Sequence, residues 1–302
     1  MPEILFHQYD NSPFSEKVRV CLGIKQLAWR CVDQPVIMPK PELVALTGGY
    51  RRIPVMQNGA DIYCDSQLIV RELERRFPEP TLFPQGDAGL AYANALWSDR
   101  AVFQAAVAII FSGLGDKVPA AFIKDRTALS GRVFDPAAMQ AAVPHMEAQM
   151  RAHIALLSDQ LADGRRYLTG ELPGLVDANA YYNLWFMRSA FPPAASLYES
   201  APHVSTWMAQ VKAIGHGERT ELSRDAALQI ARDSQPADGE ILASDAPLAG
   251  TLVTVAADDY GRDAVSGVLV GSSEHHVAIR RDDPLAGQVV VHFPRIGFSI
   301  QH

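Results

Sequence analysis

Apolar runs and helically spaced apolar positions alternate along the N-terminal part of the chain. Ile4-Leu5-Phe6 is an apolar run of the kind that forms a buried strand, and a short polar turn follows it. Pro13 then opens a segment in which Phe14, Val18 and Cys21 fall on one helical face. The pattern predicts a strand, a turn and a helix in that order.

The same alternation continues to about residue 77. Trp29 to Val32 predicts a second strand. Val55-Met56-Gln57 and Ala60 to Tyr63 predict two further strands, because Asn58-Gly59 between them is a strong hairpin signal. An apolar-periodic segment that opens at Asp65-Ser66 predicts the next helix.

A long helical region follows. Residues 88–114 predict an alanine-rich helix, and apolar positions between 146 and 161 recur in steps of four, four, three and four. Residues 175–187 are nearly all apolar, which indicates a buried helix, and Val204, Trp207, Met208 and Val211 indicate another. We therefore expect an all-α bundle.

The sequence pattern changes after Ser234, from helical periodicity to β-branched runs. Four β-branched runs, separated by turns rich in Asp, Gly and Ser, predict a small antiparallel barrel or meander; they lie at 250–255, 265–270, 277–279 and 289–293. The expected architecture is an α/β domain at 1–84, an all-α domain at 88–233 and a small all-β domain at 236–302.

Composition narrows the class of protein. The 302 residues are 48% hydrophobic and carry a formal net charge of -7, which disfavours nucleic acid and anionic membrane as partners. The longest apolar run, 105–111, is too short to span a bilayer, and the N-terminus has no signal-peptide pattern. Three cysteines without a C-x-x-C pair favour a reducing compartment, so we expect a soluble cytoplasmic protein.

No metal site is expected from the histidines. His275-His276, His292 and His302 lack the clustered or i, i+4 spacing that metal ligands need.

Ser12 stands at the predicted N-terminus of the first helix, directly before Pro13. Unpaired backbone N–H groups and the helix dipole favour an anion at this position, and a thiolate is such an anion. Ser12 can equally act as an ordinary N-cap, since serine is among the best residues for that role.

Three motifs in order carry a family resemblance. Ser12-Pro13-Phe14-Ser15, then Ile53-Pro54-Val55, then Asp65-Ser66 resembles the thioredoxin-like, glutathione-binding half of the cytosolic glutathione transferases. The resemblance covers about residues 3–84. It continues more loosely into the helical region, where Gly170 to Asp177 is similar to the family's turn into a buried helix. Residues after about 235 lie outside it.

The resemblance implies a reaction and a co-substrate. Glutathione would bind, and Ser12 would stabilise its thiolate for attack on a small electrophile, as in detoxification, without metal or nucleotide. A thiol pKa of about 8.5 must fall by about two units, or about 2.7 kcal/mol, for the thiol to be mostly ionised at neutral pH. Tyr9, Asn11 and Ser15 are alternative donors to the sulfur. Serine in place of cysteine disfavours disulfide exchange.

The remaining glutathione contacts follow from the same resemblance. Pro54 would be cis, which lets the backbone of Ile53 pair with the cysteinyl part of glutathione. The hydroxyl and N–H of Ser66, at a helix start, would take the γ-glutamyl carboxylate. Asp65 would also belong to the glutathione site, although the pair can serve only as a helix cap. The glycyl carboxylate needs a cation, for which the candidates are Lys40, Arg51 and Arg52.

An electrophile site would lie along one helical stripe. Phe14 and the stripe of Trp97, Arg100 and Phe103 are its candidates, with plain core packing as the alternative interpretation. Asp177 matches the acidic half of the family's capping box and is expected to be structural.

A second hypothesis comes from a different class of function. A non-catalytic binding or interaction protein that acts through its C-terminal β domain would keep the fold without the chemistry. In either case the family's two-fold pairing implies a homodimer, with the helix at 66–77 near the interface.

Overall fold

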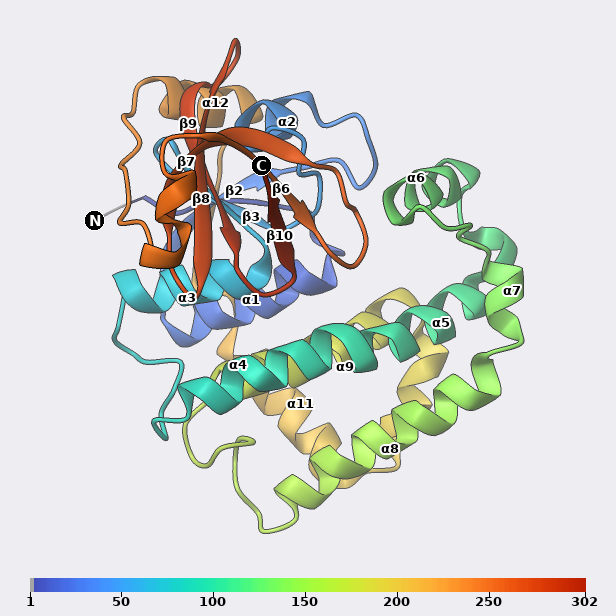
Figure 1. The fold of residues 1–302 in the computed structure, drawn as a ribbon. Coiled ribbons are helices and arrows are strands. Elements are labelled where there is room, and N and C mark those ends of the chain that lie inside the picture. Colours follow the sequence, from blue (N-terminus) through green and yellow to red (C-terminus); the bar gives the residue numbers. More distant parts are fainter. Residues whose placement is uncertain (1–2) are drawn as a thin grey trace.

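A single ten-stranded sheet runs through the protein, in the order β10-β6-β7-β8-β9-β4-β3-β1-β2-β5. The computed structural model describes residues 3–302. A layer of helices lies below the sheet in Figure 1, and two helices lie above it. The glutathione transferase-like α/β domain and the helical domain are both present, as the sequence predicts.

The first domain has the predicted order of elements. Its members are β1 (Leu5–Gln8), α1 (Pro13–Ile24), β2 (Ala28–Asp33), α2 (Pro41–Thr47), β3 (Val55–Asn58), β4 (Asp61–Cys64) and α3 (Ser66–Arg76). β1 runs parallel to β2, whereas β3 is antiparallel to both β1 and β4, so the predicted hairpin is confirmed. Only α2 has no counterpart in the sequence prediction.

Alternate side chains of the strands enter two different cores. Phe6, Trp29 and Met56 pack with α1 and α3 and with the helical domain beneath them. Val55 and Ile62 belong instead to the core on the opposite face, which α2 covers. Because successive side chains of a strand point to opposite faces, one sheet separates the two cores.

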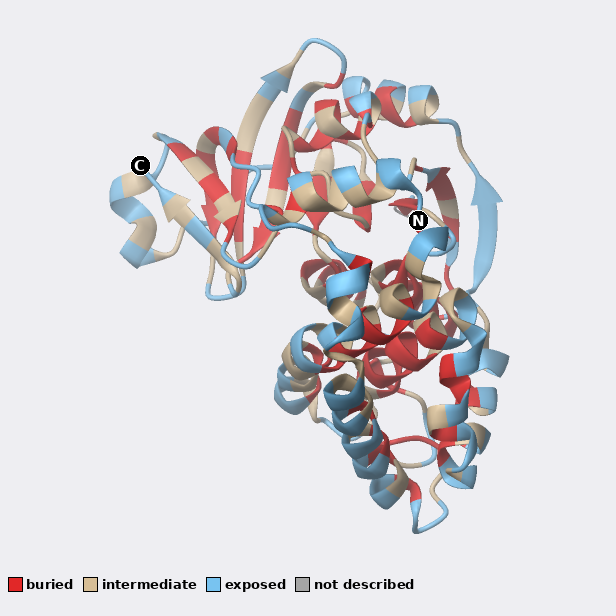
Figure 2. Ribbon diagram, turned by 90° about the vertical axis from the view of Figure 1, so that its right-hand side faces the viewer, coloured by how far each residue is buried: buried red, intermediate tan, exposed pale blue. Residues whose placement is uncertain are grey.

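The helical domain is the lower part of Figure 1. Its elements are α4 (Ala88–Trp97), η1 (Ser98–Val102), α5 (Phe103–Leu114), η2 (Gly115–Lys117), α6 (Ala120–Ser130), α7 (Pro136–Gln140), α8 (Val143–Leu161), α9 (Leu175–Ala190), η3 (Pro192–Ala195), α10 (Ser196–Glu199) and α11 (Pro202–Ile214). The buried faces of these helices meet in the interior, while α8 turns an exposed face outward (Figure 2).

The helical segment from Ala88 to Lys117 contains one π-helical turn, η1, and ends in the 3-10 turn η2. By length and composition alone it could cross a membrane, yet half of its apolar window is buried inside the protein. It packs against α8 and α9, as the core helix of a helical domain does.

The four predicted strands after residue 234 are present, and together with a fifth, at 298–301, that was not predicted they form a meander that extends the first domain's sheet. They follow η4 (Ala243–Leu248) and comprise β6 (Leu252–Ala257), β7 (Val265–Ser272), β8 (His276–Asp283), β9 (Gly287–Pro294) and β10 (Phe298–Gln301). β9 runs parallel to β4, with Ile62 opposite Val291. Residues 236–302 therefore have no separate sheet, because β4 offers them an edge with unpaired N–H and C=O groups.

Residues 218–232 also return to the first domain, although the sequence places them with the helices. β5 (Glu218–Glu221) pairs in parallel with β2, and α12 (Arg224–Arg232) packs beside α2. α12 buries Ala227, Leu228 and Ala231 on one face. Periodicity predicts such a face but does not identify the core against which it packs.

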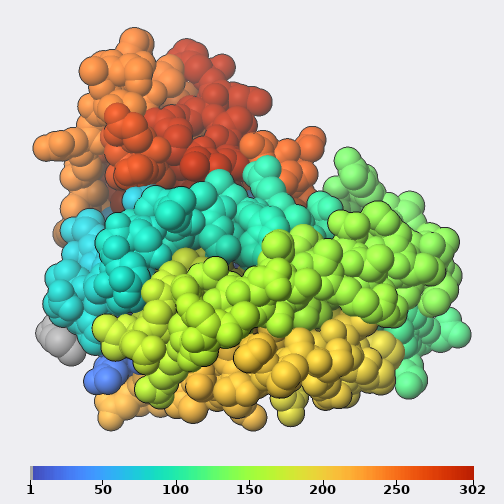
Figure 3. All heavy atoms as spheres, turned by 90° about the horizontal axis from the view of Figure 1, so that it is seen from below, coloured from blue at the N-terminus to red at the C-terminus, as the bar shows by residue number. Residues whose placement is uncertain are grey.

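Figure 3 shows the helical domain spread below the meander, which is drawn in orange and red.

Candidate functional site

Ser12 caps α1 as the sequence predicts. Its Oγ accepts a hydrogen bond from the backbone N–H of Ser15 at 3.2 Å, and its backbone N–H donates to the carbonyl of Tyr9 at 3.0 Å. Ser12 is only 1% exposed. Because a hydroxyl can donate and accept at once, Oγ keeps its proton free for a further partner.

The alternative donors of this turn differ in exposure. Asn11 is exposed, Tyr9 is half-buried, and Ser15 is buried with no partner for its hydroxyl among residues 3–302. Burial raises the pKa of Tyr9, so its phenol stays protonated at neutral pH. Tyr9 and Ser12 are thus both protonated hydroxyls in the same corner.

Lys40 lies close to this corner. Its Nζ donates to the carbonyl of Arg51 at 3.2 Å and lies 5.9 Å from the centre of the Tyr9 ring. Burial, followed by the nearby charge of Arg126, lowers the pKa of Lys40 to about 8. The charge of Lys40 is therefore sensitive to pH just above neutrality.

The Ile53-Pro54 peptide bond is cis, as the resemblance implies. β3 begins directly after it, at Val55. Asp65 is the N-cap of α3, and its carboxylate accepts from the backbone N–H of Gln67 at 3.0 Å. The φ of Asp65 is 73°, a backbone conformation that non-glycine residues adopt mainly at sites where surrounding contacts enforce it.

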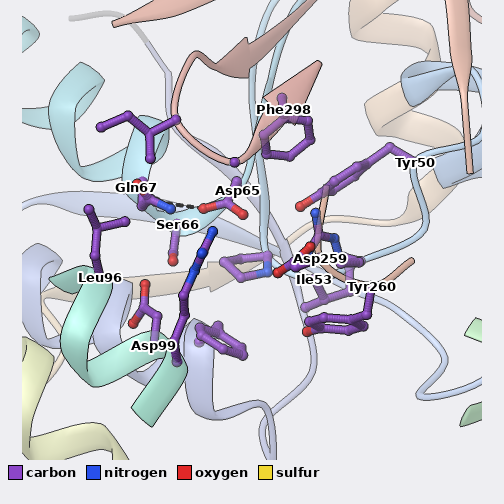
Figure 4. A pocket seen from close by; sticks show the side chains of 16 residues that line it. Tyr50, Ile53, Asp65, Ser66, Gln67, Leu96, Asp99, Asp259, Tyr260 and Phe298 are labelled. Atoms are coloured by element: carbon purple, nitrogen blue, oxygen red, sulfur yellow. Dashed lines mark hydrogen bonds and ion pairs between the residues drawn. The ribbon is translucent and has the colours of Figure 1, made fainter. Parts of the chain in front are cut away.

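A cavity lies where the three parts of the chain meet (Figure 4). The first domain contributes Phe14, Tyr50, Arg52, Ile53, Pro54, Asp65, Ser66 and Gln67. The helical domain contributes Leu96, Asp99 and Arg100, and the meander contributes Asp259, Tyr260, Ile296, Gly297 and Phe298. Asp65 and Ser66 point toward this space from the start of α3 in Figure 4.

The structure brings together only part of the predicted site. Phe14, Arg52, Ile53, Pro54, Asp65, Ser66 and Arg100 all line the cavity, whereas Tyr9, Asn11, Ser12, Ser15 and Lys40 are not among its lining residues. Ser12 lies at the N-terminus of α1, one residue before Pro13 and two before the cavity-lining Phe14.

Trp97 and Phe103 do not share the expected stripe with Arg100. Trp97 lines a second cavity with His153 and Met150, and its ring stands edge-on to that of His153 at 5.3 Å. Phe103 packs against Phe14, with ring centres 4.7 Å apart. The π-helical turn between residues 98 and 102 inserts an extra residue and rotates the following positions, which a regular 3.6-residue period cannot anticipate.

Asp99, in the same π-helical turn, is a cavity residue that the sequence did not suggest. Its carboxylate accepts from Nζ of Lys17 at 2.7 and 2.9 Å and from the hydroxyl of Tyr182 at 3.0 Å. Burial raises the pKa of Asp99, while Lys17 opposes that shift. The pair links α1 to the helical domain at the edge of the cavity.

The cavity residues of the meander were also missed. Asp259 and Tyr260 follow β6, and Phe298 begins β10, so they lie far along the sequence from the cavity residues of the first two domains, the last of which is Arg100. Short turns without a binding motif carry no local signal of their role. Pairing of β9 with β4 is what brings these turns beside the cavity.

Asp177 has the structural role that the sequence predicts. Its carboxylate accepts from the backbone N–H groups of Leu168 and Gly174, both at 2.9 Å, and from Nε1 of Trp207 at 2.8 Å. Within residues 3–302 no group of three or more His, Cys, Asp or Glu side chains is arranged to hold a metal ion.

Comparison with known proteins identifies the family to which this chain belongs. Models of the glutathione S-transferase N-terminal and C-terminal domains match residues 6–81 and 140–210. A crystal structure of a glutathione S-transferase-like protein from Pseudomonas syringae is 36% identical and has a TM-score of 0.82, and the match covers 100% of this chain and 99% of that one. The chain belongs to the glutathione S-transferase family.

More distant relatives match less of the chain. Glutathione S-transferase U3 of Arabidopsis thaliana is 29% identical over 84 residues, which are 28% of this chain and 37% of its own length. A glutathione S-transferase from Rhodospirillum rubrum is 22% identical with a TM-score of 0.53, covering 70% of this chain and 88% of that one. This last match shows the shared fold alone. The Pseudomonas match, in contrast, extends over the meander.

Proposed function

We propose that this protein is a glutathione transferase that activates the thiol of glutathione for attack on a small electrophile. The observation that carries the proposal is the meeting of Ile53-Pro54 and the N-terminus of α3 at Ser66 in one cavity with Phe14 of α1. The backbone at Ile53 can pair with an extended peptide, and the helix start at Ser66 favours a carboxylate.

Each part of glutathione has a proposed partner. The cysteinyl backbone pairs with Ile53, and the γ-glutamyl carboxylate binds at the hydroxyl and backbone N–H of Ser66. The cation for the glycyl carboxylate comes from Lys40 or from Arg52. Ser12 donates its free hydroxyl proton to the sulfur, helped by the dipole of α1.

A second candidate is a non-catalytic binding protein of the same fold. The observation that favours it is the position of Ser12, which is 1% exposed and does not line the cavity. A glutathione thiol bound in the cavity therefore does not reach this hydroxyl in the present conformation. In this case the C-terminal meander would carry the interaction function.

Retention on glutathione resin followed by an aryl-halide conjugation assay separates the two candidates. Retention with turnover supports the transferase, and retention without turnover supports the binder. Failure of both contradicts a glutathione function.

For the transferase, Ser12→Ala should lower turnover ten- to a hundred-fold, about 1.4–2.7 kcal/mol in the barrier, with a smaller effect on glutathione affinity. Ser189→Ala, at an exposed serine of α9, is the control. An unchanged rate in Ser12→Ala transfers the role to Tyr9, Asn11 or Ser15.

We also propose a cytoplasmic homodimer. The three cysteines are free and buried, which suits a reducing compartment. Arg75, near the C-terminal end of α3, is two-thirds exposed, so this end of the helix is open to a partner. Light scattering on the full chain tests the assembly, and a monomeric mass contradicts it.

A further inference from the structure

Two turns of the C-terminal meander form one wall of the cavity. The backbone N–H of Asp258, after β6, donates to the carbonyl of Gly297, before β10, at 3.0 Å. The backbone N–H of Gly261 donates to the carbonyl of Leu129 in α6 at 2.8 Å. A side chain at Gly261 would meet Leu129 at 2.8 Å, so glycine permits this close contact. The turns are therefore held against each other and against the helical domain.

Arg52 is enclosed by residues of this wall. Its side chain is 10% exposed, and its Nη1 donates to Asp259 at 3.1 Å. The guanidinium carbon lies 5.3 Å from the ring centre of Tyr50, 5.0 Å from Tyr260 and 5.5 Å from Phe298. The carboxylate and two of the three rings come from the meander, and Figure 4 shows Tyr50, Asp259 and Tyr260 grouped on one side of the cavity.

One edge of the Arg52 guanidinium is left free. Its Nε and Nη2 are buried and have no hydrogen-bond partner within the described part of the chain, residues 3–302. These two N–H groups point in the same direction and match the spacing of two carboxylate oxygens. Leaving such donors unpaired in a buried site is costly, which indicates that a ligand completes them.

We propose that Asp259, Tyr260 and Phe298 hold Arg52 so that its free Nε–Nη2 edge binds a carboxylate of a ligand in the cavity. Asp65, Asp99 and Asp259 already line this space, so a singly charged carboxylate fits better than a phosphate dianion. The inference rests on the proposed glutathione function for its choice of ligands. The carboxylate belongs either to the glycyl end of glutathione or to the second substrate.

Calorimetric titration with three probes distinguishes these sources. The probes are glutathione, γ-glutamylcysteine, which lacks the glycyl carboxylate, and benzoate, a small aromatic carboxylate. Arg52→Lys keeps the positive charge but removes the bidentate Nε–Nη2 edge. The affinity for the probe whose carboxylate binds there should therefore fall about tenfold. Tyr260→Leu opens the enclosure and should weaken the same ligand about three- to tenfold.

Ser299→Ala is the control, because Ser299 is exposed and adjoins Phe298 on the opposite face of β10. A loss confined to glutathione identifies the glycyl carboxylate, and a loss confined to benzoate identifies the second substrate. Arg52-dependent benzoate binding without any glutathione binding supports the inference while contradicting the glutathione function. The inference is overturned if Arg52→Lys and Tyr260→Leu bind every probe as tightly as the wild type does. It is also overturned if none of the three probes binds the wild type.

Discussion

At the scale of single residues, Lys40 offers the clearest dependence on pH. Burial lowers its pKa to about 8, so it loses its charge as the pH rises through that value. A bound glycyl carboxylate favours the charged form and raises the pKa again. Glutathione affinity should therefore fall by up to tenfold per pH unit above about 8, until the pKa of the complex is reached.

Titration calorimetry between pH 6.5 and 9.5 measures this loss. Lys40→Arg is the matched comparison because arginine stays charged over this range. The thiol and amine of glutathione titrate identically with both proteins, so the difference between the two curves isolates Lys40. Parallel curves would show that Lys40 does not bind the carboxylate.

At the scale of elements, the ion pair between Lys17 of α1 and Asp99 of η1 links the N-terminal α/β domain to the helical domain. The side chains are 1% and 11% exposed. Lys17→Met should lower the free energy of unfolding by about 3–5 kcal/mol, because it leaves the Asp99 carboxylate buried without its cation. The double variant Lys17→Met/Asp99→Leu should recover much of that loss.

Urea unfolding of both variants tests this prediction. Arg151→Met is the control, since Arg151 pairs with Glu147 on the exposed surface of α8 and should cost less than about 1 kcal/mol. A Lys17→Met protein as stable as the wild type would mean that Asp99 is neutral in the folded protein and needs no cation.

At the scale of the whole molecule, the meander and the first domain share one hydrophobic core. Val55 and Ile62 of the first domain pack in the same cluster as Val291 and Phe293 of β9. A chain that ends at Ser234 exposes this cluster together with the edge of β4. We expect it to aggregate and to lose cooperative thermal unfolding.

Solubility and circular dichroism melts compare this truncation with a chain that lacks only Gln301 and His302, which are exposed. The short truncation should behave as the wild type. A soluble, cooperatively folded chain ending at Ser234 would show that the meander is a separable addition.

The amino-acid sequence alone determined the local elements and the motif residues of the site. Proline at the start of α1, Asn-Gly in the hairpin and the periodicity of α8 and α9 act over a few residues, so their consequences are readable in the chain. Ile53, Pro54, Asp65 and Ser66 lie in motifs of the same short range, but their place in a site was implied by the family resemblance; all four line the cavity.

Only the tertiary structure decided how these pieces combine. Periodicity identifies a buried face or strand, but the partner that covers it depends on contacts between distant parts of the chain. Pairing of β9 with β4 placed Tyr260 and Phe298 around Arg52, and a π-helical turn separated Trp97 from the cavity while directing Asp99 toward it. Such contacts leave no local pattern, because their energy arises from surfaces that meet only when the chain has folded.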